Sequence, residues 1–469
     1  IISTFDVLPP TMKSYILLHL LRRCRVPTLQ YISSLILTSL KYDFFSLLPV
    51  DISYRIIQYL DFRSIAVCSQ VSKSWYKLFN SPENFSALLH SQGYEIPPNL
   101  YKYLYRRHYL LKKNWNNGRC HQVSFAGNGS MVVTCLQFDD DKIISGSDDN
   151  IINIYDTATG KLRKKLTGHT GGVWVLHYYG NTLVSGSTDR TVRIWDIEEG
   201  KCTHQFDGHT STVRCLQILI PTKNPITGKI EPEFPLIVTG SRDTTLRVWP
   251  NSSNTSTSGG NSSNINPYFL HTLHGHTQSV RAVAGSGNVL VSGSYDSTVR
   301  VWDLKTGESV HLLRGHMDKV YSVGYSPELE LAASGSMDTF VRVWSTKTGE
   351  CLYQLEGHSS LVGLLEISPN YIVSAAADNT LRIWSPSTGR FISALYGHTA
   401  AITCFHHDAR LNRIVSGSEG AIKLWELCSD LRVSTKTTYG TYKRDLVTGI
   451  QCVWKIEIDE RRLVCAFQR

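Results

Sequence analysis

A Gly-His dipeptide recurs in the second half of the chain at an interval of about 40 residues. Its six histidines are separated by 40, 67, 40, 42 and 40 residues: His169, His209, His276, His316, His358 and His398. The long gap is one period plus about 27 residues, which insertions near 221–235 and 250–266 supply. The second insertion is an Asn/Ser/Thr/Gly tract that we expect to be a disordered loop. A fixed period of this length is typical of stacked units that share a core.

Each period carries Ser-Gly-Ser-x-Asp followed by Thr-Val-Arg-x-Trp, as in 185–195, 292–302 and 334–344. The pattern resembles the WD repeat, in which four short strands form one blade of a β-propeller. Eight valines or isoleucines mark first strands: Val133, Val173, Val213, Val280, Val320, Val362, Ile402 and Val453. We therefore expect an eight-bladed propeller over 121–469.

The ends of this repeat array bear on how the ring closes. We expect residues 122–125, ahead of the first unit, to form the outer strand of the last blade and so join both ends of the array. The last unit is shorter than the others, which indicates that one strand of its blade is missing from this chain. The chain begins with Ile1, so we expect a fragment, with any upstream targeting segment lying outside it.

The first part of the chain has a helical period instead. Apolar residues recur at i, i+3 and i+4 between residue 5 and about 113, and one long helix is expected over 101–115. The fold class is therefore multidomain, α followed by all-β: helices first, then the propeller.

The composition is that of a globular chain with a modest basic excess. Lys and Arg total 48 against 39 Asp and Glu, a net charge of +9, which is compatible with an anionic ligand. Eleven cysteines lie without a C-x-x-C pair, which disfavours a zinc ribbon or a disulfide framework and favours a reducing compartment. We expect no metal, no cofactor and, lacking a run of ~18 apolar residues, no membrane span.

Residues common to most units serve the blades. We expect each Gly-His histidine to be supported by an aspartate in a tight turn, which satisfies buried polar groups. These aspartates are Asp149, Asp189, Asp243, Asp296, Asp338 and Asp378. A strand position shared by five units is structural for the same reason: Arg193, Arg247, Arg300, Arg342 and Arg382.

Residues confined to neighbouring units are candidates for binding a ligand. The position after the first-strand valine and the positions beside the turn aspartate vary between units, and both lie on one face of the disc. Four arginines fall there on the second to fourth units, Arg190, Arg214, Arg242 and Arg281, beside Trp174 and Tyr295. Guanidinium groups bind phosphate oxygens in pairs, and a phosphorylated side chain brings about two charges that one arginine cannot balance. Trp174 and Trp454 offer flat apolar walls.

A phosphopeptide is the favoured ligand of this cluster. Another anionic peptide and single-stranded nucleic acid stay open, as does accidental clustering, although the patch is compact rather than a long groove.

The helical part contains a segment that resembles an F-box, the module that docks on the Skp adaptor of SCF ubiquitin ligases. The residues that carry this likeness are Leu47, Leu48, Pro49, Ile52, Ile56, Leu60, Ile65, Val71 and Trp75. Joined to the repeats, it makes nearly all of residues 5–469 similar to the F-box and WD-repeat substrate receptors of the cell division control protein 4 type, with F-box and WD-repeat protein 7 as the metazoan counterpart. Further closely similar stretches are Gly-Gly-Val-Trp174 and Ser292-Gly-Ser-Tyr295-Asp.

The resemblance implies domains and site roles. It implies a helical dimerisation-like region over 1–42, an F-box over 43–88, a helical linker over 89–120 and the propeller thereafter. The family's phosphate-binding arginines match the four arginines above, its proline-packing tryptophan matches Trp174, and Trp454 matches a tryptophan of the apolar wall. Its partner residues match Thr188, Thr212, Tyr295 and Tyr321. Asn150 stands where fungal members carry a lysine, so a bias against basic target residues is not implied here.

The function implied is that of a non-catalytic, nuclear receptor, with a cytoplasmic pool left open. It would bind the Skp adaptor, and through it cullin and RING subunits, and direct phosphorylated targets such as cell-cycle regulators to ubiquitination and proteasomal degradation. Residues 5–45 would pair two copies, although a plain hydrophobic core explains their apolar faces equally well. The alternative is a WD-repeat scaffold outside any ligase that binds an acidic peptide.

Overall fold

The structure is a computed structural model that describes residues 9–31, 48, 52–53, 67–68, 70–79, 100–127, 131–225, 228–250, 270–427 and 440–468. The chain forms two compact units, residues 1–114 and 115–469.

The helices of the described residues occupy the first unit and its boundary with the second. They are α2 (Pro10–Leu21), a helical stretch over 26–31, α7 (Lys73–Phe79) and α9 (Leu100–Asn117), and α9 confirms the helix expected over 101–115. Ser72 caps α7, because its Oγ accepts the backbone N–H of Trp75 at 3.1 Å. Among the described helices, none combines the length and apolar character that a membrane crossing requires.

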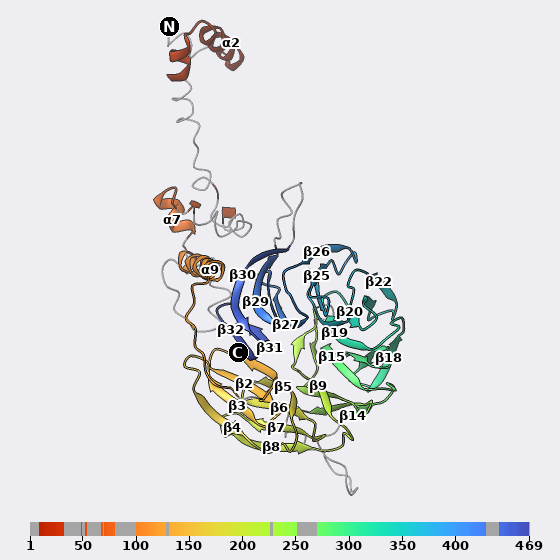
Figure 1. The fold of residues 1–469 in the computed structure, drawn as a ribbon. Helices are drawn as coiled ribbons and strands as arrows, with labels where there is room; N and C mark the ends of the chain where they lie inside the picture. Colours follow the sequence, from red (N-terminus) through yellow and green to blue (C-terminus); the bar gives the residue numbers. More distant parts are fainter. Residues whose placement is uncertain are drawn as a thin grey trace. The chain divides into compact units, whose positions relative to one another are not determined.

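The second unit is built of antiparallel sheets arranged in a ring (Figure 1). In its described part seven sheets have four strands. The first three are β1 (Val133–Phe138), β2 (Lys142–Ser147), β3 (Ile152–Asp156) and β4 (Leu162–Leu166); β5 (Val173–Tyr179), β6 (Thr182–Ser187), β7 (Val192–Asp196) and β8 (Lys201–Phe206); and β9 (Val213–Leu219), β12 (Leu236–Ser241), β13 (Leu246–Pro250) and β14 (His271–Leu273).

The remaining four sheets repeat this plan. They are β15 (Val280–Ser286), β16 (Val289–Ser294), β17 (Val299–Asp303) and β18 (Glu308–Leu313); β19 (Val320–Ser326), β20 (Leu331–Ser336), β21 (Val341–Ser345) and β22 (Cys351–Leu355); β23 (Val362–Ile367), β24 (Ile372–Ala376), β25 (Leu381–Trp384) and β26 (Phe391–Leu395); and β27 (Ile402–Asp408), β28 (Arg413–Ser418), β29 (Gly420–Leu427) and β30 (Gly440–Ile450). The insertion near 221–235 forms the hairpin β10 (Thr222–Lys223) and β11 (Ile230–Glu231), while 251–269 lie outside the described residues.

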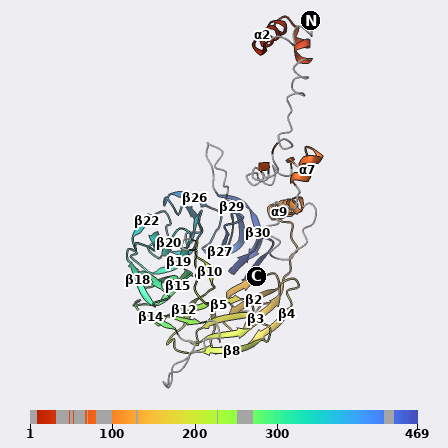
Figure 2. The same ribbon diagram turned by 180° about the vertical axis from the view of Figure 1, so that it is seen from behind.

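The expected count of eight blades is wrong, because only seven complete blades are present in the described residues. The eighth first-strand residue, Val453, lies in β31 (Cys452–Ile458), which pairs with β32 (Leu463–Gln468) alone. A first-strand valine marks an inner strand and says nothing about how many strands follow it. The two-stranded unit packs β31 against β27 and β1, so it lies between the seventh and first sheets, as both views show (Figures 1 and 2).

The expected outer strand at 122–125 is also absent. Residues 121–127 form no strand, and the Phe125 ring packs instead on Tyr155 of the first sheet, with the ring centroids 4.8 Å apart. Contacts of β31 with β1 join the two ends of the array, together with an ion pair between Arg462 and Asp140.

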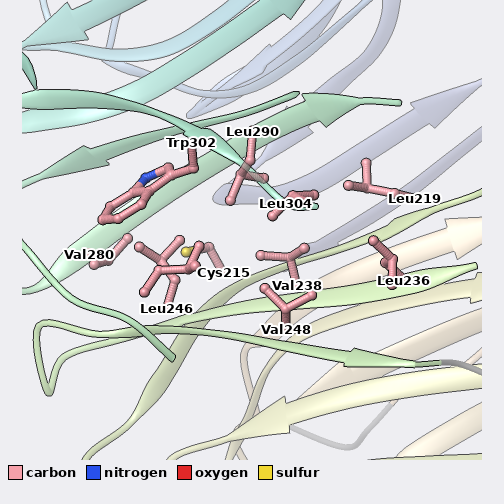
Figure 3. Close-up of a cluster of buried hydrophobic side chains, with 11 residues drawn as sticks. Cys215, Leu219, Leu236, Val238, Leu246, Val248, Val280, Leu290, Trp302 and Leu304 are labelled. Carbon is pink, nitrogen blue, oxygen red and sulfur yellow. The ribbon is translucent and has the colours of Figure 1, made fainter. Parts of the chain in front are cut away.

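The core lies between neighbouring sheets. Figure 3 shows the cluster between the third and fourth sheets, where Leu246 faces the indole of Trp302 and Val238 lies toward Leu290. All four side chains are buried. Strand residues that are apolar on both faces are needed in such a ring, because each sheet packs against a neighbour on either side.

One buried hydrogen-bond chain recurs in the blades and confirms the structural role of the histidines. In the fourth sheet Trp302 Nε1 donates to Ser292 Oγ at 2.8 Å, Ser292 Oγ meets His276 Nε2 at 2.8 Å, and His276 Nδ1 meets Asp296 Oδ2 at 2.9 Å. Burial favours a raised pKa for the Asp296 carboxyl, but hydrogen bonds from His276 and Thr298 outweigh it and hold that pKa below its ordinary value. The other histidine–aspartate pairs are His169–Asp189, His209–Asp243, His316–Asp338 and His358–Asp378. The expectation is wrong for His398, whose Nδ1 meets Ser418 Oγ at 2.7 Å because Glu419 follows that serine in place of the usual turn.

Replacing Ser292 by Ala interrupts this chain, because the Trp302 N–H and the buried His276 Nε2 both lose their partner. We expect the free energy of unfolding to fall by about 2 kcal/mol, since unsatisfied buried polar groups cost ~1–3 kcal/mol each. Urea denaturation measures the change. Ser359→Ala, at an exposed serine, is the control and should leave the urea concentration at the unfolding midpoint unchanged.

Candidate functional site

A β-bulge occurs at the same position in every unit. The pairing of the first strand with the second skips one residue, the one after the marker valine or isoleucine: Thr134, Trp174, Arg214, Arg281, Tyr321, Gly363, Thr403 and Trp454. A bulged residue is released from the ladder and its side chain is re-aimed. Because this position is free of pairing constraints, it is where units can differ without loss of the blade.

The turn after the second strand lies beside this bulge in each blade. The residue before the turn aspartate donates its backbone N–H to the carbonyl of the residue before the marker valine. Arg242 donates to Thr212 at 2.9 Å, Tyr295 to Ser279 at 3.0 Å and Thr188 to Gly172 at 3.0 Å. Both variable positions of a blade therefore lie next to each other on one face of the disc.

Arg190 stands on the other side of its turn aspartate, with a φ of 73°. Five other turns have a left-handed residue at the same place: Asn150, Thr244, Ser297, Thr339 and Asn379. Left-handed backbone is costly for a long side chain, whereas asparagine adopts it more readily. The arginine is therefore not the residue that the turn itself favours.

Two arginines and two tyrosines from three consecutive blades come together. The Arg214 guanidinium carbon lies 5.4 Å from the centroid of the Tyr295 ring, a cation–π contact. The centroids of the Tyr295 and Tyr321 rings lie 5.2 Å apart, and the ring planes are tilted by 42° to each other. Burial and the neighbouring Tyr295 raise the pKa of the Tyr321 hydroxyl, and the positive charge of Arg281 opposes that rise. Arg281 is the bulged residue of the blade that carries Tyr295, whose backbone N–H is bonded to Ser279 just before it.

Behind this group lies the Cys215 thiol in the core. Burial raises its pKa to about 12, and the charges of Arg281 and Arg214 oppose the rise. Both arginines are bulged residues of strands that contact each other, β9 of the third blade and β15 of the fourth.

Lys319 joins the group, although the sequence patterns did not predict it. Its ammonium lies 5.5 Å from the centroid of the Tyr295 ring, so that ring contacts cations from both the third and the fifth blade. The sequence did contain a signal for Lys319. In the column before the marker residue, Lys319 is the charged member among Val132, Gly172, Thr212, Ser279, Leu361, Ala401 and Cys452.

The charge of this group is not neutralised within the described residues. Neither the four arginines nor Lys319 forms an ion pair with a carboxylate there, and the turn aspartates of these blades are engaged by their histidines. Five cations on four neighbouring blades therefore face solvent or a ligand. Such a surface favours a dianion, whose oxygens accept hydrogen bonds from guanidinium N–H groups and from tyrosine hydroxyls.

The other predicted residues lie on the same face without joining the cluster. Trp174 is 44% exposed at its bulge, and Trp454 is half-buried at the bulge of β31. Arg190 and Arg242 are exposed, and Thr188 and Thr212 are half-buried. In the part of the propeller that is described, none of these six side chains makes a ring or ion-pair contact with Tyr295 or Tyr321. The roles given to them by resemblance therefore stay predictions.

Four of the nine predicted adaptor-binding residues are described. Ile52 and Val71 are 47% and 61% exposed, Leu48 is half-buried, and Trp75 lies half-buried in α7. Leu47, Pro49, Ile56, Leu60 and Ile65 lie outside the described residues. Across the residues with a described placement, no three His, Cys, Asp or Glu side chains form a group that could hold a metal ion.

Comparison with known families agrees with this architecture. The WD domain, G-beta repeat, matches seven segments: 118–156, 160–196, 200–250, 267–303, 307–345, 349–385 and 389–426. The F-box domain matches residues 45–86. The chain belongs to the F-box and WD-repeat proteins. The resemblance seen in the sequence is thereby confirmed.

This F-box and WD-repeat protein is similar to others over all or part of its length. Cell division control protein 4 of Candida albicans is 42% identical over 495 residues, which cover 97% of this chain and 70% of that protein. The probable E3 ubiquitin ligase complex SCF subunit sconB of Arthroderma benhamiae is 28% identical over 34% of this chain and 30% of its own. The crystal structure of the computationally designed Ika8 protein has a TM-score of 0.61 and 29% identity, and the match covers 74% of this chain and 96% of that one.

The charge of Arg281 affects the pKa of the Tyr321 hydroxyl, which predicts a shift in titration. In Arg281→Ala the pKa of Tyr321 should rise above its wild-type value, because the positive charge that favours the tyrosinate is gone. Arg281→Lys keeps the charge and should titrate close to wild type. NMR of ring-labelled tyrosine measures both, and equal values in wild type and Arg281→Ala would contradict this arrangement.

Proposed function

We propose that this chain is the substrate-recognition subunit of an SCF-type E3 ubiquitin ligase. Its propeller binds phosphorylated Ser/Thr-Pro segments of target proteins, and its F-box binds the Skp adaptor and, through it, the cullin and RING subunits. The observation that carries the proposal is the un-neutralised cluster of Arg214, Arg281 and Lys319 around Tyr295 and Tyr321, in a chain that also contains an F-box.

The chemistry of the cluster fits a phosphate ester better than a single carboxylate. A phosphoserine or phosphothreonine carries about −1.5 to −2 charges and three acceptor oxygens. Arg214 and Arg281 offer planar donors on adjacent blades, and Arg242 lies at the turn of the blade that carries Arg214. Trp174, exposed on the second blade, offers a flat wall for the following proline.

In this function the chain positions a target and does no bond chemistry itself. Holding a target lysine near a ubiquitin carrier raises its effective concentration, which accelerates transfer by the partner subunits. We further propose that the targets include cell-cycle regulators destined for proteasomal degradation, that the complex acts in the nucleus, and that residues 5–45 pair two copies. The exposed Met12, Tyr15 and Leu20 of α2 are compatible with that pairing.

Phosphopeptide binding by the propeller should depend on Arg214. We expect Arg214→Ala to cost about 2 kcal/mol of affinity for a phosphorylated Ser/Thr-Pro peptide, because charge-assisted hydrogen bonds are lost. Calorimetric titration against matched phosphorylated and unphosphorylated peptides provides the measurement. Arg390→Ala, an exposed arginine outside the cluster, should bind as wild type does. Equal affinity of the wild type for both peptides would reject the proposal.

Adaptor binding should depend on the F-box and not on the propeller. Val71→Asp places a charge on an exposed apolar residue, so we expect co-purification with a Skp adaptor to be lost, while phosphopeptide affinity stays within twofold of wild type. If Val71→Asp still recovered the adaptor in full, a WD-repeat scaffold outside any ligase would be the better description.

A further inference from the structure

Lys319 occupies a distinct place at the edge of the cationic cluster. It belongs to the fifth blade, one residue before the β19 marker Val320, whereas the cluster's arginines, Arg214 and Arg281, belong to the third and fourth blades. Its backbone is fixed at both ends. The Lys319 N–H donates to Asp318 Oδ1 at 2.7 Å, and its carbonyl accepts the N–H of Met337 at 2.9 Å.

The ammonium of Lys319 lacks an ion-pair partner among the described carboxylates. Asp318 is adjacent and exposed, but its carboxylate accepts the Lys319 backbone N–H, and the Nζ instead faces the Tyr295 ring. A half-buried ammonium over an aromatic ring keeps its charge and can still accept a further anionic partner from solvent. Tyr295 thus contacts two cationic positions, Arg214 of the third blade and Lys319 of the fifth.

We propose that Lys319 is a specificity-determining residue that selects a second negative group on the bound peptide, N-terminal to the phosphorylated serine or threonine. The shared chemistry is an anionic side chain, either a carboxylate or a second phosphate. This inference rests on the proposed function, because the direction of the peptide follows from a proline packed on Trp174.

The direction and reach follow from the order of the blades. If the proline after the phosphorylated residue packs on Trp174 of the second blade and the phosphate lies at Arg214 and Arg281, the preceding residues run toward the fifth blade. The Arg214 guanidinium and the Lys319 ammonium lie 5.4 Å and 5.5 Å from the centroid of the Tyr295 ring, so these two groups are at most about 11 Å apart. An extended peptide covers that span in roughly three residues, which points to position −3.

A peptide series on the whole protein tests this selection. Phosphorylated Ser/Thr-Pro peptides carrying Gln, Glu or phosphoserine at −3 are titrated against wild type and Lys319→Met, an uncharged side chain of similar length. For wild type we expect Glu to bind about fourfold tighter than Gln, and phosphoserine tighter still, as for a partly exposed ion pair. In Lys319→Met the affinity for the Glu peptide divided by that for the Gln peptide should fall to about one. In wild type this affinity ratio should become smaller as the salt concentration is raised.

Two further variants separate selection from a structural role. Lys319→Glu should reverse the preference, so that a peptide with Lys at −3 binds better than one with Glu, and Lys347→Met, at an exposed lysine of another turn, should keep the wild-type ratio. If Lys319 merely supports Tyr295, Lys319→Met weakens all three peptides equally and leaves the ratio intact, which overturns the inference. An absent Glu preference at −2, −3 and −4 in a wild type that still requires the phosphate also overturns it. Loss of the phosphate requirement itself would reject the proposed function instead.

Discussion

The hydrogen-bond chain from tryptophan through serine and histidine to the turn aspartate is the interaction on which the rest of each blade depends. It runs from the third strand through the second to the Gly-His loop and ends in the turn. The turn is therefore held by buried groups, and the residue before its aspartate is tied by its N–H to the start of the first strand. A surface position that is fixed in this way can carry any side chain, and in the third and fourth blades it carries Arg242 and Tyr295.

The bulge in the first strand frees the second variable position of each blade. It removes one residue per blade from the pairing pattern, so evolution of that side chain does not disturb the ladder. Site residues and scaffold residues are thus neighbours in sequence, but they differ in their contribution to stability. The scaffold residues are buried and hydrogen-bonded, whereas the site residues are half-buried or exposed. This division explains how one blade plan presents tryptophan, arginine and tyrosine at equivalent places.

Much of this was predictable from the sequence, because the repeat acts as its own alignment. It located the first strands, five histidine–aspartate pairs and the variable columns that hold Arg214, Arg281 and Tyr295, whose binding roles stay predictions. It failed where a residue pattern does not encode pairing. Val453 marks a first strand, but only one further strand pairs with it, so it does not mark a complete blade. Residues 122–125 have the composition of a strand, but the Phe125 ring packs on Tyr155 and the segment pairs with no sheet. Lys319 was missed because its neighbourhood depends on how the fourth and fifth blades approach, which the spacing alone does not give.

The way the ring closes also bears on how the protein is made. Trp115 donates its indole N–H to the carbonyl of Glu460 at 3.1 Å, across 345 positions of sequence, and β31 lies against β1. Early blades can form as they are synthesised, but β1 has no partner on its open side until β31 has left the ribosome. Contacts of such long range form slowly, and apolar surface that stays exposed in the meantime invites aggregation. Nascent chains of this protein should therefore need chaperone protection until β31 has been made.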